Sequence, residues 1–116
     1  MKRSKKNCTV DAFIFLNYFP ENSKGLIIAP VKIPNGRTPQ KQIELFIDQG
    51  YSRVFINEEI ETLDSLDASE IKDRAIIELI IDRVKTSNEE ENISRIAESI
   101  ETAFLESDGT CKVVVY

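Results

Sequence analysis

The chain has 116 residues, of which 41% are hydrophobic and 30% are charged, and this composition is ordinary for one folded domain. A chain of this length buries roughly two thirds of its unfolded surface, so folding requires neither a metal nor a disulfide. The formal net charge of -5 argues against a protein whose whole surface binds a phosphate backbone, because nucleic-acid-binding proteins are usually basic. No apolar run approaches the roughly 20 residues of a membrane span, and no signal-type segment follows the N-terminus, so we expect a cytoplasmic protein.

Histidine is absent, which excludes every catalytic triad or dyad with an imidazole base and every zinc site that contains histidine. The two cysteines, Cys8 and Cys111, cannot form a thiolate cage by themselves. Because they lack C-x-x-C spacing and a partner base, we expect reduced thiols rather than a disulfide framework or a nucleophile. The four glycines stand singly, so the sequence contains no phosphate-binding loop.

The N-terminal third predicts a helix followed by a strand. Residues 1–8 contain four basic side chains, and we expect a disordered basic leader or the stub of a connection in a longer protein. Residues 9–19 have apolar side chains at helical spacing, which predicts a first helix that ends at Pro20. Residues 26–33 form an apolar, β-branched run that is typical of a strand covered on both faces.

The middle of the chain predicts a second helix and two strands. Thr38 followed by Pro39 is an N-cap with proline at the first helical position, and Gly50 stands where a left-handed C-terminal cap is expected. A helix is therefore predicted between them. Residues 51–56 alternate as a strand does, and residues 57–63 are expected to turn into a second short strand.

The acidic residues 64–73 are expected to form a loop or a single helical turn. Residues 75–84 give the strongest strand pattern in the chain. Strict alternation along this strand separates Ile77 and Leu79 on one face from Asp82 and Val84 on the other.

The C-terminal part predicts a third helix and a last strand. Ser87 and Glu90 fit a capping box, and the helix that follows is expected to end at Asp108. Residues 111–116 form the last strand, and an apolar strand that runs to the final residue is expected in a piece of a longer polypeptide. The predicted order is α-β-α-β-β-β-α-β, which is a single α/β (α+β) domain with about three helices packed on a mixed sheet of about five strands.

Two kinds of charged residue are candidates for function. Glu58, Glu59 and Glu61 are adjacent or alternating in a strand pair, which favours a solvated hairpin over a cation site or a pair of catalytic carboxylates. Arg53 and Arg83 lie on strands, and arginine is suited to bidentate contact with a partner's carboxylate. Structural salt bridges within the domain are the alternative for both arginines.

Four segments, in chain order, resemble the UvrA family, the damage-sensing ATPases of bacterial nucleotide excision repair. Residues 26–31 (LIIAPV) are similar to the family's LLAPV strand, and residues 50–59 (GYSRVFINEE) are similar to G-Y-x-R-V-R-I-D-G-E. Residues 77–83 (IELIIDR) resemble I-E-V-V-V-D-R, and residues 95–104 (RIAESIETAF) resemble R-L-A-E-S-L-E-T-A-L. The resemblance spans residues 9–116 and corresponds to the inserted domain through which UvrA binds UvrB.

This chain departs from the family pattern at three positions. Phe55 replaces a second arginine, Glu58 replaces a glycine, and Arg74 stands where histidine is usual. Arg53 and Arg83 are the arginines that are retained.

The resemblance implies a protein–protein interaction domain over residues 9–116, with UvrB and the rest of UvrA as its partners. Arg53 and Arg83 are then expected to contact acidic groups of UvrB, and Glu58, Glu59 and Asp82 to complete the binding face. No catalytic residue, metal or cofactor is expected in this domain, since ATP and zinc are implied only for the rest of the parent ATPase.

Two other functions are left open by the sequence. One is an accessory DNA contact, in which Arg37, Lys41, Lys32 and the N-terminal lysines form a local basic strip despite the acidic average. The other is a small-ligand regulatory α/β domain, for which the sequence offers no convergent polar site.

Overall fold

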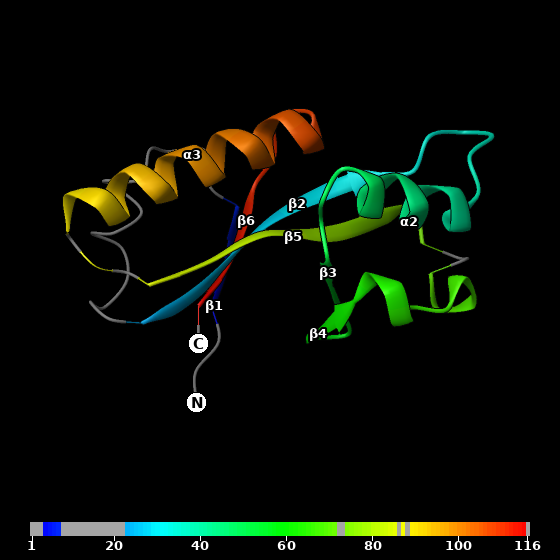
Figure 1. The fold of residues 1–116 in the computed structure, drawn as a ribbon, viewed down its shortest axis with the longest axis horizontal. Helices are drawn as coiled ribbons and strands as arrows, with labels where there is room; N and C mark the ends of the chain where they lie inside the picture. The colour runs from blue at the N-terminus through cyan, green and yellow to red at the C-terminus, as the bar shows by residue number, and fades with distance from the viewer. Residues whose placement is uncertain (1–3, 8–22, 72–73, 86, 88, 116) are drawn as a thin grey trace.

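The computed structural model describes residues 4–7, 23–71, 74–85, 87 and 89–115 (Figure 1). Within these residues the sheet has six strands: β1 (Ser4–Asn7), β2 (Lys24–Lys32), β3 (Arg53–Ile56), β4 (Glu59–Thr62), β5 (Ile76–Lys85) and β6 (Lys112–Val115). The same residues contain the helices α2 (Pro39–Asp48) and α3 (Glu90–Ser107), and two 3-10 turns, η1 (Leu63–Ser65) and η2 (Ala68–Glu70). The expected helix at residues 9–19 lies outside the described residues.

The five expected strands are present as β2 to β6, and β1 is a sixth. Strand β1 comes from the basic leader and pairs antiparallel with β6, with Ser4 opposite Val115. The expectation of a disordered leader is wrong for Ser4–Asn7, because the edge of β6 offers these residues backbone hydrogen-bond partners. Residues 4 and 115 are therefore neighbours in the sheet.

The sheet has the order β1-β6-β2-β5-β3-β4, and every described pairing is antiparallel. The expectation of a mixed sheet is wrong, for a topological reason. Helix α2 connects β2 to β3 and α3 connects β5 to β6, and each pair runs in the same direction as a helical crossover requires. In both cases one antiparallel strand lies between the two: β5 separates β2 from β3, and β2 separates β5 from β6.

The helices cover one face of the sheet. Phe46 of α2 and Ile100 of α3 belong to one buried cluster with sheet residues such as Ile27 and Leu79. The opposite face has a second, smaller cluster, which consists of Leu26, Ile28, Phe55, Ile80 and Val114. Successive side chains of a strand point to opposite faces, so β2 contributes alternate residues to both clusters.

A β-bulge interrupts β5. Ile27 lies opposite Asp82 and Ile28 lies opposite Ile80, so that Ile81 is an extra residue without a partner of its own in β2. Beyond the bulge the alternation is reset, and Val84 joins Leu79 in the cluster under the helices. The predicted separation of Asp82 and Val84 from the Leu79 face is wrong for this reason.

The hairpin of β3 and β4 confirms the predicted second short strand. Its two turn residues, Asn57 (φ 52°) and Glu58 (φ 66°), both have the left-handed backbone that a two-residue turn of type I′ requires. Glu58 is an unusual residue for this conformation, in which glycine is preferred.

The two helices begin differently. Thr38 caps α2 as predicted, and its Oγ1 accepts a hydrogen bond from the backbone N–H of Lys41 at 3.1 Å. Helix α3 has Glu89 as its N-cap, without a side-chain capping hydrogen bond. The predicted capping box of Ser87 is wrong, because its Oγ accepts from the backbone N–H of Glu89 in the turn before the helix.

Cys111 is completely buried and disulfide-bonded. The expectation of a reduced thiol is therefore wrong for Cys111, because spacing along the chain does not predict which cysteines can reach each other in a fold. Cys8 lies outside the described residues.

Candidate functional site

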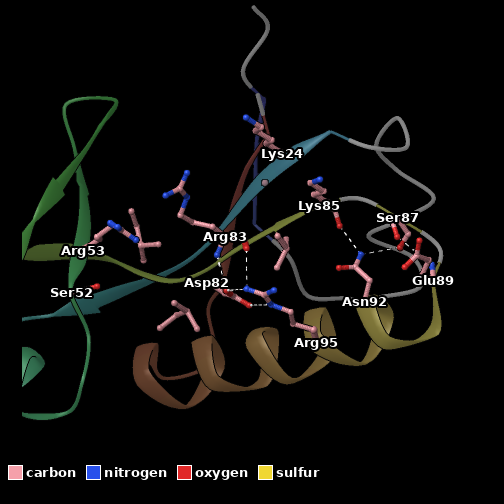
Figure 2. A pocket seen from close by; sticks show the side chains of 14 residues that line it. Lys24, Ser52, Arg53, Asp82, Arg83, Lys85, Ser87, Glu89, Asn92 and Arg95 are labelled. Carbon is pink, nitrogen blue, oxygen red and sulfur yellow. Dashed lines mark hydrogen bonds and ion pairs between the residues drawn. The ribbon is translucent and has the colours of Figure 1, made fainter.

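A hollow of about 770 Å³ lies where the first residues of β2 and β3, the second half of β5 and the first turns of α3 meet (Figure 2). Its charged and polar lining residues include Lys24, Arg53, Asp82, Arg83, Lys85, Glu89, Asn92 and Arg95. We call this feature the basic hollow.

The basic hollow concentrates positive charge in an acidic chain. Its cations are Lys24, Arg53, Arg83, Lys85 and Arg95, whereas its acidic residues are Asp82 and Glu89. Among the described residues, the side chains of the first four cations form no ion pair, while Arg95 is paired. The net charge of the whole chain is -5, so the hollow differs in sign from the molecule around it.

Arg53 and Arg83 lie on the face of the sheet opposite to the one that α2 and α3 cover. Val54, the next residue after Arg53, belongs to the buried cluster under the helices. Because side chains alternate along a strand, Arg53 lies on the other face, together with Phe55. Arg83 lies opposite Leu26, which belongs to the same face as Phe55. Both arginines are exposed, and both line the basic hollow.

Asp82 points the other way, toward helix α3 (Figure 2). Its carboxylate accepts two hydrogen bonds from Arg95, from Nε at 2.9 Å and from Nη2 at 2.7 Å. Ser99 Oγ donates a third at 2.8 Å, and the backbone N–H of Arg83 donates a fourth at 2.8 Å. We call Asp82, Arg95 and Ser99 the Asp82 cluster.

These contacts control the charge of Asp82. Burial opposes ionisation of the carboxyl group, but the hydrogen bonds from Arg95, Ser99 and the Arg83 backbone, together with the charge of Arg95, outweigh it. The pKa of Asp82 is therefore lower than its ordinary value. The pKa of Arg95 is raised for the complementary reason, because its hydrogen bonds and charge pairing with Asp82 favour the cation.

The two predicted glutamates lie apart from the basic hollow. Glu58 lines a smaller hollow that also contains Arg74 and Glu78, and Glu59 is the first residue of β4. Both belong to the hairpin whose first residue is Arg53. The structure thus brings Arg53, Arg83 and Asp82 together and places the glutamates at the hairpin turn.

Arg37 and Lys41 line a third hollow, at the loop that precedes α2. Arg37 Nη1 donates a 3.0 Å hydrogen bond to Oε1 of the buried Gln42, so one donor of this guanidinium is already used within the domain. These two residues are neighbours, as the predicted basic strip requires, but they are separate from the basic hollow.

Sequence reasoning missed four residues of the site: Lys24, Lys85, Arg95 and Ser99. One signal was available for the last two, because residues four positions apart lie on the same face of a helix. The two lysines come from opposite ends of strands that pair with each other, with Lys24 opposite Lys85. The two lysines are neighbours only because β2 pairs with β5, which the local sequence does not indicate.

The described part of the chain contains no group of three or more histidine, cysteine, aspartate or glutamate residues arranged to hold a metal ion. Neither described helix is both long and apolar enough to cross a membrane.

A family model described as the UvrA interaction domain matches residues 10–116. The chain is 35% identical over 100 residues to UvrABC system protein A of Borreliella burgdorferi, which covers 84% of this chain and 10% of that protein. It is 33% identical over 107 residues to the protein of the same name from Helicobacter pylori, which covers 92% of this chain and 11% of the relative. The chain therefore spans about a tenth of the length of these relatives.

Proposed function

The chain belongs to the UvrA interaction domain family, and on this premise we propose that it is a docking module that binds UvrB during nucleotide excision repair. The relatives are full-length proteins of the UvrABC system, and this chain corresponds to about a tenth of each. ATP hydrolysis, zinc binding and damage recognition are accordingly proposed for the rest of such a protein, in the cytoplasm, and not for this domain.

The observation that carries the proposal is the convergence of Arg53 and Arg83 on one hollow. They come from different strands, share the sheet face opposite to α2 and α3, and are exposed. Neither guanidinium forms an ion pair within the described residues. An exposed pair of arginines in an otherwise acidic molecule is complementary to carboxylates, which guanidinium groups bind in a bidentate manner.

The other predicted residues have different roles in this proposal. Glu58 and Glu59 lie at the hairpin turn, outside the basic hollow, and form the edge of the proposed UvrB-binding surface. Their carboxylates repel acidic groups of a partner that docks in the wrong position. Asp82 supports the surface from the helix side rather than contacting the partner. The interface is polar and is no larger than a standard one of about 1,600 Å², as expected for a transient transfer of DNA between subunits.

The test is calorimetric titration of UvrB from the same organism into the domain. We expect Arg53→Glu and Arg83→Glu each to weaken binding by about tenfold or more, because each places a carboxylate where the partner's own carboxylates must approach. Arg37→Glu is the matched control, since it makes the same change of charge outside the basic hollow. Circular dichroism shows whether each variant is folded. Unchanged binding by folded Arg53→Glu and Arg83→Glu variants would refute the residue assignment.

The DNA-contact alternative receives weaker support, from the shared hollow of Arg37 and Lys41. Filter binding with duplex DNA at low salt tests it. A steep dependence of affinity on salt, lost in the double variant Arg37→Ala and Lys41→Ala, would favour direct DNA contact.

A further inference from the structure

The bulge in β5 decides which face of the sheet Arg83 occupies. Ile80 lies on the face opposite to α2 and α3, so uninterrupted alternation would place Ile81 on the helix-covered face, Asp82 on the opposite face and Arg83 on the helix-covered face. The extra residue at Ile81 shifts the register, and Arg83 pairs with Leu26 on the face opposite to the helices instead. Arg53 lies on this same face, so the two arginines share a hollow only because of the bulge.

The backbone of Arg83 lies at a poorly covered edge of β5. Strand β3 pairs with β5 at Leu79 and Glu78, and the described pairing extends no further along β5. Beyond that point β5 has β2 as its described neighbour on one side only. Backbone N–H and C=O groups at such an edge need other partners.

The Asp82 cluster supplies those partners. The backbone N–H of Arg83 donates to Asp82 Oδ1 at 2.8 Å, and the carbonyl oxygen of Arg83 accepts from Arg95 Nη2 at 3.3 Å. Asp82 and Arg95 are joined to each other, and Ser99 joins Asp82 to a second turn of α3. The carbonyl oxygen of Arg83 is thereby bonded directly to helix α3, and its N–H is linked to α3 through Asp82.

We propose that Asp82 and Arg95 are positioning residues for partner binding, which hold the bulge in β5 and so keep the Arg83 guanidinium on the same face as Arg53. This inference rests on the proposed docking role of Arg83. A slip of one residue would close the bulge and move Arg83 to the helix-covered face, where it could not reach the partner. The Asp82 cluster opposes this slip, because closing the bulge would break two sets of hydrogen bonds. These are the bonds from Arg95 and Ser99 to the Asp82 carboxylate, and the bonds that Asp82 and Arg95 form with the backbone of Arg83.

The first test is a double-mutant cycle on UvrB binding. Asp82→Asn keeps the shape of the side chain, removes the charge that pairs with Arg95, and replaces one of the two acceptor oxygens with an NH₂ donor. We expect it to weaken binding by about tenfold in the wild-type background and by less than about twofold in the Arg83→Ala background, since Asp82 acts through Arg83. Thr102→Ala is the control, because it removes another hydrogen bond of α3 that does not involve the Asp82 cluster.

The second test needs no partner. Amide hydrogen exchange in the isolated domain reports whether the Arg83 N–H is bonded, and we expect Asp82→Ala, which removes the acceptor, to accelerate exchange at Arg83 by about tenfold more than at Leu79, which lies in the same strand before the bulge. Uniform acceleration along β5 would overturn the proposal, because it would show a general loss of stability. Unchanged exchange at Arg83 would overturn it as well.

The two proposals fail in different ways. Binding that is unaffected by Arg83→Ala refutes the docking role of Arg83 and, with it, the functional part of this inference. The positioning role alone is refuted if Arg83→Ala weakens binding as expected, but Asp82→Asn weakens binding equally in the wild-type and Arg83→Ala backgrounds.

Discussion

Arg74 Nη2 donates a 2.8 Å hydrogen bond to Oδ1 of Asn57, and this contact ties the turn between β3 and β4 to the segment that precedes β5. The turn itself is formed by Asn57 and Glu58, both with positive φ. Arg74 therefore holds a turn in which one of the two residues is poorly suited to its backbone conformation. The stability of this hairpin matters for the proposed docking role, because Arg53 is its first residue.

Glu58→Gly is expected to stabilise the domain by about 0.5 to 1 kcal/mol. A left-handed conformation costs an ordinary L-residue about 1 to 2 kcal/mol, whereas glycine avoids this cost and loses part of the gain through the greater freedom of its unfolded chain. Asn-Gly is the preferred pair for a type I′ turn. Urea denaturation gives the free energy of unfolding of both proteins.

Two controls separate the backbone effect from the loss of the Glu58 carboxylate. Glu58→Gln removes the charge and keeps the strained backbone, so it should not reproduce the stabilisation. Glu59→Gly places glycine in β4, where no positive φ is required, and should lower stability by about 0.5 to 1 kcal/mol. Equal effects of glycine at the two positions would contradict the explanation.

Thr38→Ala is expected to lower the free energy of unfolding by about 1 kcal/mol. The Thr38 hydroxyl satisfies the backbone N–H of Lys41, which has no partner within the helix, and alanine cannot replace this bond. Thr38→Ser retains the acceptor and should have nearly wild-type stability. Chemical denaturation of the three proteins provides the measurement, and equal losses for alanine and serine would exclude capping as the cause.

The contribution of Asp82 to stability should disappear in acid. Its pKa in the folded state is lower than in the unfolded state, where it is about 3.9, so its ionised form stabilises the fold at higher pH. This stabilisation is fully present above the unfolded pKa and is lost as the pH falls through the folded pKa. Wild type should therefore exceed Asp82→Asn by about 1 to 2 kcal/mol near neutral pH, and by progressively less below about pH 4.

Urea midpoints for wild type and Asp82→Asn at about pH 7, 5 and 3 test this expectation. A difference that stays constant down to the lowest pH would show that the charge of Asp82 is not the stabilising feature.

The local pattern of the sequence predicted most of the elements, because alternation and helix caps are encoded by neighbouring residues. Thr38 and Pro39 indicated the start of α2, and the alternating residues 51–56 indicated β3. Strand order and direction are different, since they depend on which strands lie between the ends of each helical connection. Nothing local indicates that β5 lies between β2 and β3, or that the sheet is antiparallel.

The candidate site shows the same division. Arg53 and Arg83 were predicted from their chemistry and from a resemblance, whereas their common hollow depends on the pairing of β5 with β2 and on a bulge. The residues around Ile81 contain no glycine that would indicate a bulge, so alternation assigned the residues after it to the wrong faces. The link from Asp82 to Ser99 spans 17 positions in the sequence and could not be found from local spacing.

The charge of the basic hollow predicts how the proposed binding to UvrB should respond to salt. The lysines Lys24 and Lys85 lie opposite each other at its edge, and neither ammonium is paired within the described residues. Such peripheral charges accelerate association more than they strengthen the final complex, and salt screens them over a Debye length of about 8 to 10 Å.

Lys24→Gln and Lys85→Gln should therefore slow association several-fold at about 50 mM salt, with little effect at about 500 mM, and should leave the dissociation rate nearly unchanged. Arg83→Ala, which removes a side chain proposed to contact UvrB directly, should instead raise the dissociation rate at both salt concentrations. Stopped-flow or surface-plasmon measurements of both rate constants distinguish the two behaviours, and an effect of the lysine variants confined to dissociation would show that the lysines contact UvrB directly.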